Sequence, residues 1–340
     1  MEKTKHTSRL QSFRSPLKPR QTRRACFHDY CAPSIYMFTL LKAGAVPNFS
    51  HIEGNPKSVS GPDAPHTVCS DIGRIISKEI LKTGKMRSDH IDVYPYVIMP
   101  DHVHLMLRVK KRLNQPITKI IGIMEGAISS VCRKSELIGP EQSVFEAGCI
   151  NDRILYGKDH LSTLKKYIAD NPRRYLIKKL YPDLFLHHIS IMAGEKVFSS
   201  VGNLFLLRRP LYPVHVRRRW IQSEKDAYKE ECANRVKAGY VLVSPFIHPV
   251  EREIMKETLD LGGCIIKITE RGFADRWKPE GKWFDLCAEG RYLVLTESGS
   301  SVRHVDMTYG IASHMNELAA YIASLPKVSL RFRPAQIERT

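Results

Sequence analysis

The sequence predicts an α+β domain in the N-terminal half of the chain and a parallel α/β domain in the C-terminal half. The expected elements of the first half follow the order β-α-β-β-α-β, with a hairpin in the middle and one more helix at the end. This order is the ferredoxin-like split βαβ pattern, an antiparallel sheet with helices on one face. In the second half, single strands alternate with helices, which favours a Rossmann-like parallel sheet. The length of 340 residues also fits two domains.

The first elements follow from the spacing of their apolar residues. Residues 34–41 read SIYMFTLL, and this aromatic and β-branched run predicts a buried strand. Residues 43–66 are rich in Gly, Pro, Asn and Ser and are expected to form a long loop. Isoleucines recur at helical spacing in residues 67–82, and Gly84 is expected to end that helix.

The hairpin is expected from two apolar runs, at residues 91–99 and 102–109, around a Pro-Asp turn. A helix then opens at Pro116, a short strand is expected around 143–150, and a helix covers about 159–180. Because side chains alternate along a strand, His102 and His104 must share one face while Val103 and its apolar neighbours point to the core. Two imidazoles on one face provide half of a metal site. The triplet alone is weak support, since such pairs also occur on half-buried strands.

In the second half, the expected strands and helices alternate regularly. Strands are predicted at 197–207, 240–244, 264–268 and 292–295, and helices at 223–238, 249–261 and 307–323. The loop SPFIHP after the second of these strands contains no glycine, which disfavours a phosphate cradle and leaves a scaffolding or DNA-holding role. The helix start at Pro249, with Ser244 nearby, could still accept an anion.

The net charge indicates the class of partner. The chain carries 53 Lys+Arg against 35 Asp+Glu, a formal net charge of +18. Residues 1–182 hold 30 of these basic and 16 of the acidic residues, so most of the excess lies in the first half. A basic surface of this size favours a polyanionic partner, most often nucleic acid, over an acidic membrane surface.

Other bulk features suggest a cytoplasmic protein. The eight cysteines form no C-x-x-C pair, which is typical of reduced thiols rather than of a zinc ribbon or a disulfide framework. No apolar run is long enough for a membrane span, and no secretory signal is visible. The region 1–30 is basic, with almost no apolar periodicity, and is expected to form a disordered arm.

The helix expected at 159–180 supplies the remaining chemistry. Tyr167 and Asn171 are four residues apart and therefore share one helical face. An amide oxygen is a suitable ligand for Mg²⁺ or Mn²⁺ beside two imidazoles, and a phenol can attack a phosphate. Read separately, the two residues are better explained by structure alone, with Tyr167 as a core residue and Asn171 as a residue that ends the helix before Pro172.

Three segments together resemble a known family. MPDHVHLML, NDRILYGKDHL and KKYIADNPRRYL resemble the single-tyrosine HUH transposases, in particular the REP-associated tyrosine transposases. Members of that family carry a His-hydrophobic-His strand, and a Y-I-x-x-N-P helix that holds the nucleophilic tyrosine and a third metal ligand. The resemblance covers about residues 31–182 and implies an HUH endonuclease domain there. A fainter similarity to DNA-processing and nucleotide-binding Rossmann-like modules covers residues 190–325, to which the sequence assigns no role.

The resemblance implies a role for each matching residue. His102, His104 and Asn171 would bind Mg²⁺ or Mn²⁺, and Tyr167 would cleave and rejoin single-stranded or hairpin DNA through a 5′-phosphotyrosine. The neighbouring basic residues would contact phosphates; these are Arg108, Lys110, Lys111, Arg112, Arg153, Lys165, Lys166, Arg173 and Arg174. Related enzymes can be dimers, so a homodimer is one of the forms that the resemblance allows. No residue is identified as the base that activates Tyr167.

Two alternatives remain open at this point. One is a non-catalytic nucleic-acid-binding regulator that keeps the fold without the reaction. The other is a relaxase or replication initiator, which would share the histidine pair and the tyrosine. The target DNA, and whether the protein mobilises its own gene, cannot be read from the sequence.

Overall fold

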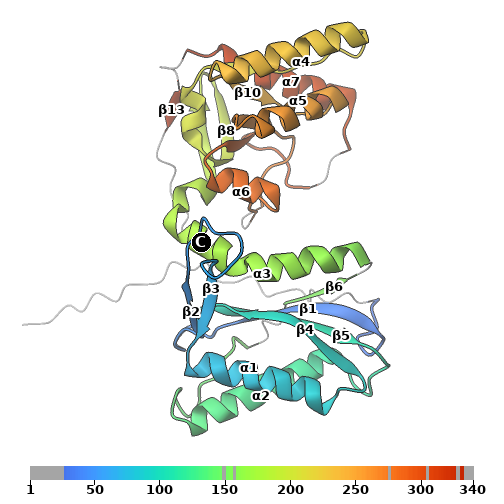
Figure 1. The fold of residues 1–340 in the computed structure, drawn as a ribbon, viewed down its shortest axis with the longest axis vertical. Coiled ribbons are helices and arrows are strands. Elements are labelled where there is room, and N and C mark those ends of the chain that lie inside the picture. The colour runs from blue at the N-terminus through green and yellow to red at the C-terminus, as the bar shows by residue number, and fades with distance from the viewer. Residues whose placement is uncertain are drawn as a thin grey trace, which may run out of the picture. The chain divides into compact units, whose positions relative to one another are not determined.

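The protein has a mixed α+β architecture that divides into two compact units. The computed structural model describes residues 27–147, 151–155, 158–274, 277–303, 306–326 and 330–332. The first unit extends to Leu176 and the second begins at Ile177. Of the predicted basic arm, residues 1–26 lie outside the described part of the chain. Figure 1 shows the helices and strands of both units.

A four-stranded antiparallel sheet forms the centre of the first unit. Its strands are β1 (Ser34–Leu41), β4 (Ile91–Ile98), β5 (His102–Val109) and β6 (Asn151–Leu155). Their order across the sheet is β4-β5-β1-β6, and every neighbouring pair is antiparallel. In this register Leu41 lies opposite His102, and Thr39 lies opposite His104. The strand β5, the second strand of the hairpin, therefore lies between β1 and β4, the first two strands of this sheet in chain order.

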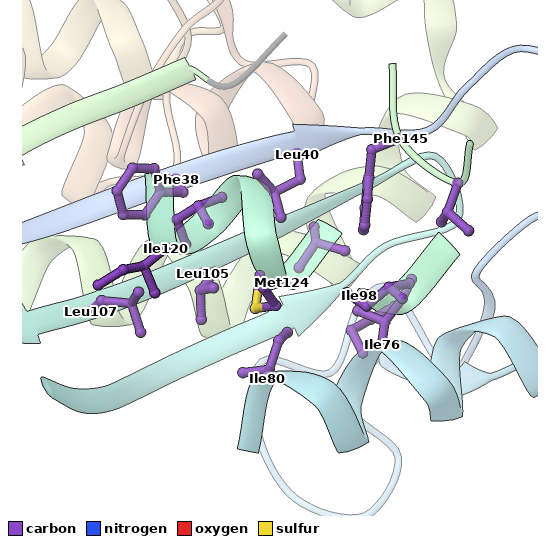
Figure 2. Close-up of a cluster of buried hydrophobic side chains, with 14 of the residues drawn as sticks. Phe38, Leu40, Ile76, Ile80, Ile98, Leu105, Leu107, Ile120, Met124 and Phe145 are labelled. Atoms are coloured by element: carbon purple, nitrogen blue, oxygen red, sulfur yellow. The ribbon is translucent and has the colours of Figure 1, made fainter. Parts of the chain in front are cut away.

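Two helices cover one face of this sheet. They are α1 (Asp71–Met86) and α2 (Ile117–Lys134), drawn on the same side of the sheet in Figure 1. Figure 2 shows their apolar stripes meeting the sheet, with Ile76 and Ile80 from α1, Ile120 from α2, and Phe38 and Leu105 from the strands. Full burial of side chains of this size contributes about 1.5–3 kcal/mol each.

The helix α3 (Lys158–Leu180) packs on the opposite face. Its Leu164 and Ile168 lie four residues apart and join Met37 and Met106 of the sheet in a second apolar cluster. Helices thus cover both faces of the sheet, whereas the expected pattern placed its helices on one face. The reason is that β1 and β5 carry apolar residues on both faces, so both faces need cover.

The expected boundaries shift at two places in the first unit. The region predicted as a loop contains the strand β2 (Ser50–Glu53), which pairs antiparallel with β3 (His66–Cys69). Because β3 uses the residues where the first helix was expected to start, α1 begins later, with the Ser70 side chain accepting from the Gly73 amide at 3.2 Å. The strand expected at 143–150 is found later in the chain, as β6. In residues 143–147 Phe145 forms an isolated bridge to Lys42, and residues 148–150 lie outside the described segments.

The second unit is built on a seven-stranded sheet. Its strands are β7 (His188–Ala193), β8 (Lys196–Gly202), β9 (Leu211–Pro213), β10 (Val241–Ser244), β11 (Ile265–Ile268), β12 (Tyr292–Glu297) and β13 (Leu330–Phe332). The order is β13-β7-β8-β12-β11-β10-β9. The four strands from β9 to β12 are parallel, and the remaining pairings are antiparallel. The sheet is therefore mixed rather than wholly parallel as expected.

Apolar cores lie on both faces of the second sheet. One contains Leu242, Ile265 and Val294 with residues of α4 (Gln222–Lys237), α5 (Pro249–Asp260) and α6 (Lys282–Ala288). The other joins the alternate strand residues with α7 (Tyr309–Ser324). The sequence patterns missed the short strands β7, β9 and β13, the helix α6, and the 3₁₀ turns Pro182–Phe185 and Leu204–Arg208.

Two further predictions concern the chain as a whole. The six cysteines in the described segments are free thiols; Cys26 and Cys149, also expected to be reduced, lie outside those segments. None of the helices that the structure describes is long and apolar enough to cross a membrane.

Candidate active site

His102 and His104 stand together on the face of the sheet that α3 covers. Val103, Leu105 and Leu107 of the same strand lie in the core with α1 and α2, as the alternation predicted. The two imidazole rings are 4.6 Å apart between centroids. The His104 residue is only 7% exposed, and the His102 side chain is 18% exposed.

Each imidazole has a fixed partner at Nδ1. His102 Nδ1 donates to Asp101 Oδ1 at 2.7 Å, and His104 Nδ1 is hydrogen-bonded to the Thr39 hydroxyl at 2.9 Å. A partner at one ring nitrogen sets the tautomer and the orientation of the ring. In both residues Nε2 is consequently the nitrogen that a ligand would take.

Tyr167 lies against this pair. Its ring centroid is 5.6 Å from that of His104, with the two planes inclined by 60°. The residue is 36% exposed, so solvent reaches it, and the Arg174 guanidinium lies 5.7 Å from the ring centroid. The phenol thus combines contact with the histidine pair, a cation at its ring and access from outside.

Asn171 lies on the sheet-facing stripe of α3. It is 7% exposed and falls in the helical series of Leu164, Ile168 and Tyr175, which pack in the cluster between helix and sheet. Its Nδ2 donates to the Tyr167 carbonyl oxygen at 3.3 Å, which leaves Oδ1 as its acceptor atom.

Two tyrosines of α3, each one turn from Asn171, relate the helix to the strand β5. Four residues before it, Tyr167 contacts His104. Four residues after it, burial raises the pKa of Tyr175, and the negative charge of Asp101 raises it further, which places that phenol within electrostatic reach of the start of β5. Asn171 therefore lies on α3 one turn after Tyr167, whose ring contacts His104.

Of the three expected metal ligands, two are histidines, which are common metal ligands, and the third is the amide of Asn171. Within the described residues no group of three or more His, Cys, Asp or Glu side chains is placed to hold a metal ion. The third expected ligand, Asn171, is an amide and belongs to none of these four residue types. Two imidazoles with fixed tautomers and a buried amide oxygen suit a divalent cation that accepts mixed nitrogen and oxygen ligands.

The nine basic residues expected to contact phosphates differ in their surroundings. Three form ion pairs: Lys110 with Asp92 at 2.9 Å, Arg112 with Asp29 at 2.7 Å and Arg173 with Asp170 at 2.6 Å. Lys165 lies 4.9 Å from the ring centroid of Tyr94, and Arg174 lies at Tyr167. The other four are exposed and form no ion pair within the described segments; they are Arg108, Lys111, Arg153 and Lys166.

Two of the four exposed cations lie on the histidine face. Arg108 is four residues after His104 in β5, so it points to the same side of the sheet. Arg153 of β6 is opposite Met37, which belongs to the cluster under α3. These two side chains border the site on the sheet itself.

Sequence reasoning missed the two residues that hold the imidazoles. Asp101 directly precedes His102, so the motif D-H-x-H carried a usable signal. Thr39 gave none, because its position opposite His104 depends on the pairing of strands more than sixty residues apart.

The loop after β10 does not form an anion site. The Glu251 carboxylate is 2% exposed and accepts from the backbone amides of Val216 and Ile247 at 3.0 Å and of His248 at 3.2 Å. The chain's own carboxylate therefore occupies the start of α5, where an external anion was considered from the sequence.

Comparison with known proteins gives a weak structural similarity and no family. No family model matches the chain, and no curated protein matches it. Among solved structures, a REP-associated tyrosine transposase bound to a REP hairpin is similar, with a TM-score of 0.32 and 10% sequence identity. The matched region covers 44% of this chain and 72% of that one. A similarity of this size establishes neither a family nor an activity.

Proposed function

We propose that the first unit is a metal-dependent HUH-type endonuclease and transposase that cleaves and rejoins single-stranded or hairpin DNA through a phosphotyrosine at Tyr167. The observation that carries the proposal is the position of Tyr167 against His104, with His102 on the same face of the sheet. The phenol and the two imidazoles come from a helix and a strand some sixty residues apart in sequence, and Asn171, which we propose as the third ligand, lies one turn after Tyr167.

The strand order supports a ferredoxin-like assignment for this unit. In the four-stranded sheet, the hairpin strand β5 lies between β1 and β4, the first two strands of the sheet in chain order. This is the arrangement of a split βαβ unit, with α1 as the crossover. In the second unit, four parallel strands with helices on both faces support a Rossmann-like assignment.

The residues at the site fit Mg²⁺ or Mn²⁺. His102 and His104 would bind through Nε2, and Asn171 would bind through Oδ1. The Asp101 carboxylate and the Thr39 hydroxyl would keep the imidazoles in the tautomer that binding requires. A bound divalent cation would polarise a phosphoryl oxygen and stabilise the charge that develops there.

The reaction that we propose exchanges one phosphodiester for another. The Tyr167 oxygen attacks phosphorus, a P–O bond to the tyrosine forms, and the bond to the 3′ oxygen breaks, which leaves a 5′-phosphotyrosine and a free 3′-OH. The phenolic proton passes to solvent, and the 3′ oxygen is protonated in turn. Because the number of P–O bonds is conserved, the step is reversible and requires no nucleotide cofactor.

The partial exposure of Tyr167 and its cationic surroundings suit this role. A nucleophile for DNA must be reachable, and Tyr167 is the one of the four site residues that is exposed. Arg174 at its ring, together with Arg108 and Arg153 on the sheet face, would offset the charge of the approaching backbone.

The test is covalent capture. Purified protein is mixed with Mn²⁺ and single-stranded oligonucleotides that carry the short imperfect palindromes flanking its gene, and a denaturant-stable protein–DNA adduct is expected. The adduct should disappear in Tyr167→Phe, which keeps the ring but removes the nucleophile. Tyr175→Phe, two turns along the same helix, is the matched control and should keep the adduct.

An adduct that persists in Tyr167→Phe contradicts the assignment of the nucleophile. Salt-sensitive DNA binding that gives no covalent product, and that is unaffected by a chelator or by His102→Ala combined with His104→Ala, would instead support the non-catalytic regulator.

A further inference from the structure

A second polar cluster lies in the C-terminal unit, at the carboxyl ends of its parallel strands. In the pairing of β10 with β11, Ser244 is the partner of Lys267, and Lys267 is in turn the partner of Val294 in β12. Lys267 lies two residues after Ile265 and therefore on the same face of the sheet, the face covered by α4, α5 and α6. Open α/β sheets bind their ligands at this edge.

Lys267 is an unusual residue for this position. The other three residues of β11 are buried and apolar, while Lys267 places an ammonium among the helices on one face. Its Nζ lies 5.6 Å from the ring centroid of Trp283, and it forms no hydrogen bond or ion pair within the described part of the unit. Burial lowers the pKa of Lys267; Glu270 opposes this effect and the charge of Lys282 adds to it.

Lys282 brings a second cation to the same indole. Its Nζ lies 4.9 Å from the Trp283 ring centroid, and it too forms no ion pair with any residue that the structure describes. Glu270, the acid whose charge acts on Lys267, is engaged by Arg271 at 3.5 Å and by the Thr269 hydroxyl at 3.3 Å. Two ammonium groups around one ring repel each other, which costs free energy unless an anion joins them.

Thr296 adds a hydroxyl to this cluster. It lies two residues beyond Val294 in β12, on the same face and diagonal to Lys267. It is 1% exposed, and its Oγ1 has no hydrogen-bond partner in the described structure. Buried hydroxyl groups normally form a hydrogen bond. A buried hydroxyl without one, at the edge where such sheets bind ligands, therefore indicates that a bound ligand would supply the partner.

We propose that Lys267, Lys282 and Thr296 bind a phosphoryl group of a nucleotide or of a nucleic-acid backbone. Two lysine ammonium groups suit a tetrahedral anion with more than one negative charge better than they suit a single carboxylate, because each acts as a separate point charge. The hydroxyl supplies a neutral donor beside them. The site lies wholly in the second unit and does not depend on the proposed reaction at Tyr167.

The experiment measures the binding of phosphate compounds to the full-length protein by calorimetry. The probes are inorganic pyrophosphate, ATP and an oligo-dT of twelve nucleotides. Lys267→Met and Lys282→Met are each expected to weaken pyrophosphate binding by at least about tenfold. The matched control is Lys237→Met, which removes an exposed lysine at the end of α4, near the amino end of β10, and should leave the affinity unchanged.

The variants keep the test decisive. Lys267→Met replaces a half-buried charge by an apolar group of similar length and should fold; if it does not, the exposed Lys282 carries the test alone. ATP binding tighter than oligo-dT would assign a nucleotide, and the reverse, with the same loss in the variants, would assign a nucleic-acid backbone. Absence of binding of all three probes, or an unchanged affinity in the variants, would overturn the proposal. Adduct formation at Tyr167 is expected to be unchanged in all of these variants, so the two proposals can fail separately.

Discussion

The ring of Tyr167 rests beside the imidazole of His104, with 5.6 Å between their centroids. The contact joins α3 to β5, and it follows from how the helix is docked. Leu164 and Ile168 insert into the apolar cluster on the sheet, and this fixes the rotation of the helix about its axis. The position of the phenol is therefore a consequence of core packing rather than of a flexible loop.

The Thr39 hydroxyl is expected to control metal affinity through His104. Thr39→Val keeps the shape of the side chain but leaves a buried imidazole nitrogen without its hydrogen bond. Loss of such an outer partner typically lowers metal affinity by about 10–100-fold. Titration with Mn²⁺ should show this loss, while Thr258→Val, which removes a buried hydroxyl bonded to the Ile254 carbonyl, should not. Equal affinity in Thr39→Val and the parent protein would contradict the role of His104 as a ligand.

Asp101 should matter less than Thr39, although its hydrogen bond to His102 is shorter. The Asp101 side chain is 62% exposed, so water can replace the carboxylate in Asp101→Ala, whereas water has little access to His104. We expect a loss of Mn²⁺ affinity of less than about tenfold, measured in the same titration. If Asp101→Ala lost more Mn²⁺ affinity than Thr39→Val, the exposure of the two hydrogen bonds would not determine which of them matters more.

Local periodicity was sufficient to predict which face of β5 carries the histidines. A period of two places Val103, Leu105 and Leu107 in the core and the histidines opposite, and the structure has this arrangement. The predicted helix at 159–180 was also accurate, since α3 spans Lys158–Leu180 despite Pro172 in its interior. Both features depend only on neighbours within a few residues of one another.

Features that depend on distant pairing were not predictable. Thr39 became a partner of His104 through the antiparallel register of β1 with β5. Lys267 reached its place beside Ser244 through parallel pairing of β10 with β11, and nothing in the short run IIKI indicates which strands flank it. The β2–β3 pair was missed because a loop-like composition does not exclude two four-residue strands that pair with each other.

Glu125 is expected to make the stability of the first unit depend on pH. Burial raises the pKa of this α2 carboxyl from 4.5 to about 7. The folded protein then holds a proton that the unfolded chain has already lost, so stability falls as pH rises from about 4.5 and levels off above about 7. Glu125→Gln should therefore be more stable than the parent at pH 8, by about 1–2 kcal/mol after solvent screening, and nearly equal to it at pH 4. Thermal melts at both pH values measure the difference; a gain of the same size at pH 4 would contradict titration as its cause.

The salt dependence of DNA binding should separate the free cations from the paired ones. Each phosphate contact on a single strand contributes roughly −0.7 to the slope of log K against log salt concentration. Arg153→Gln and Lys166→Gln remove exposed cations without an ion-pair partner in the described segments, and each is expected to reduce the slope by about that amount if it contacts DNA. Lys110→Gln should change it little, because Asp92 already engages that ammonium at 2.9 Å. Fluorescence anisotropy of a labelled oligonucleotide, measured across a series of KCl concentrations, gives the three slopes. A slope that changes in Lys110→Gln but not in Arg153→Gln would place the DNA path at the end of β5 that is far from His102.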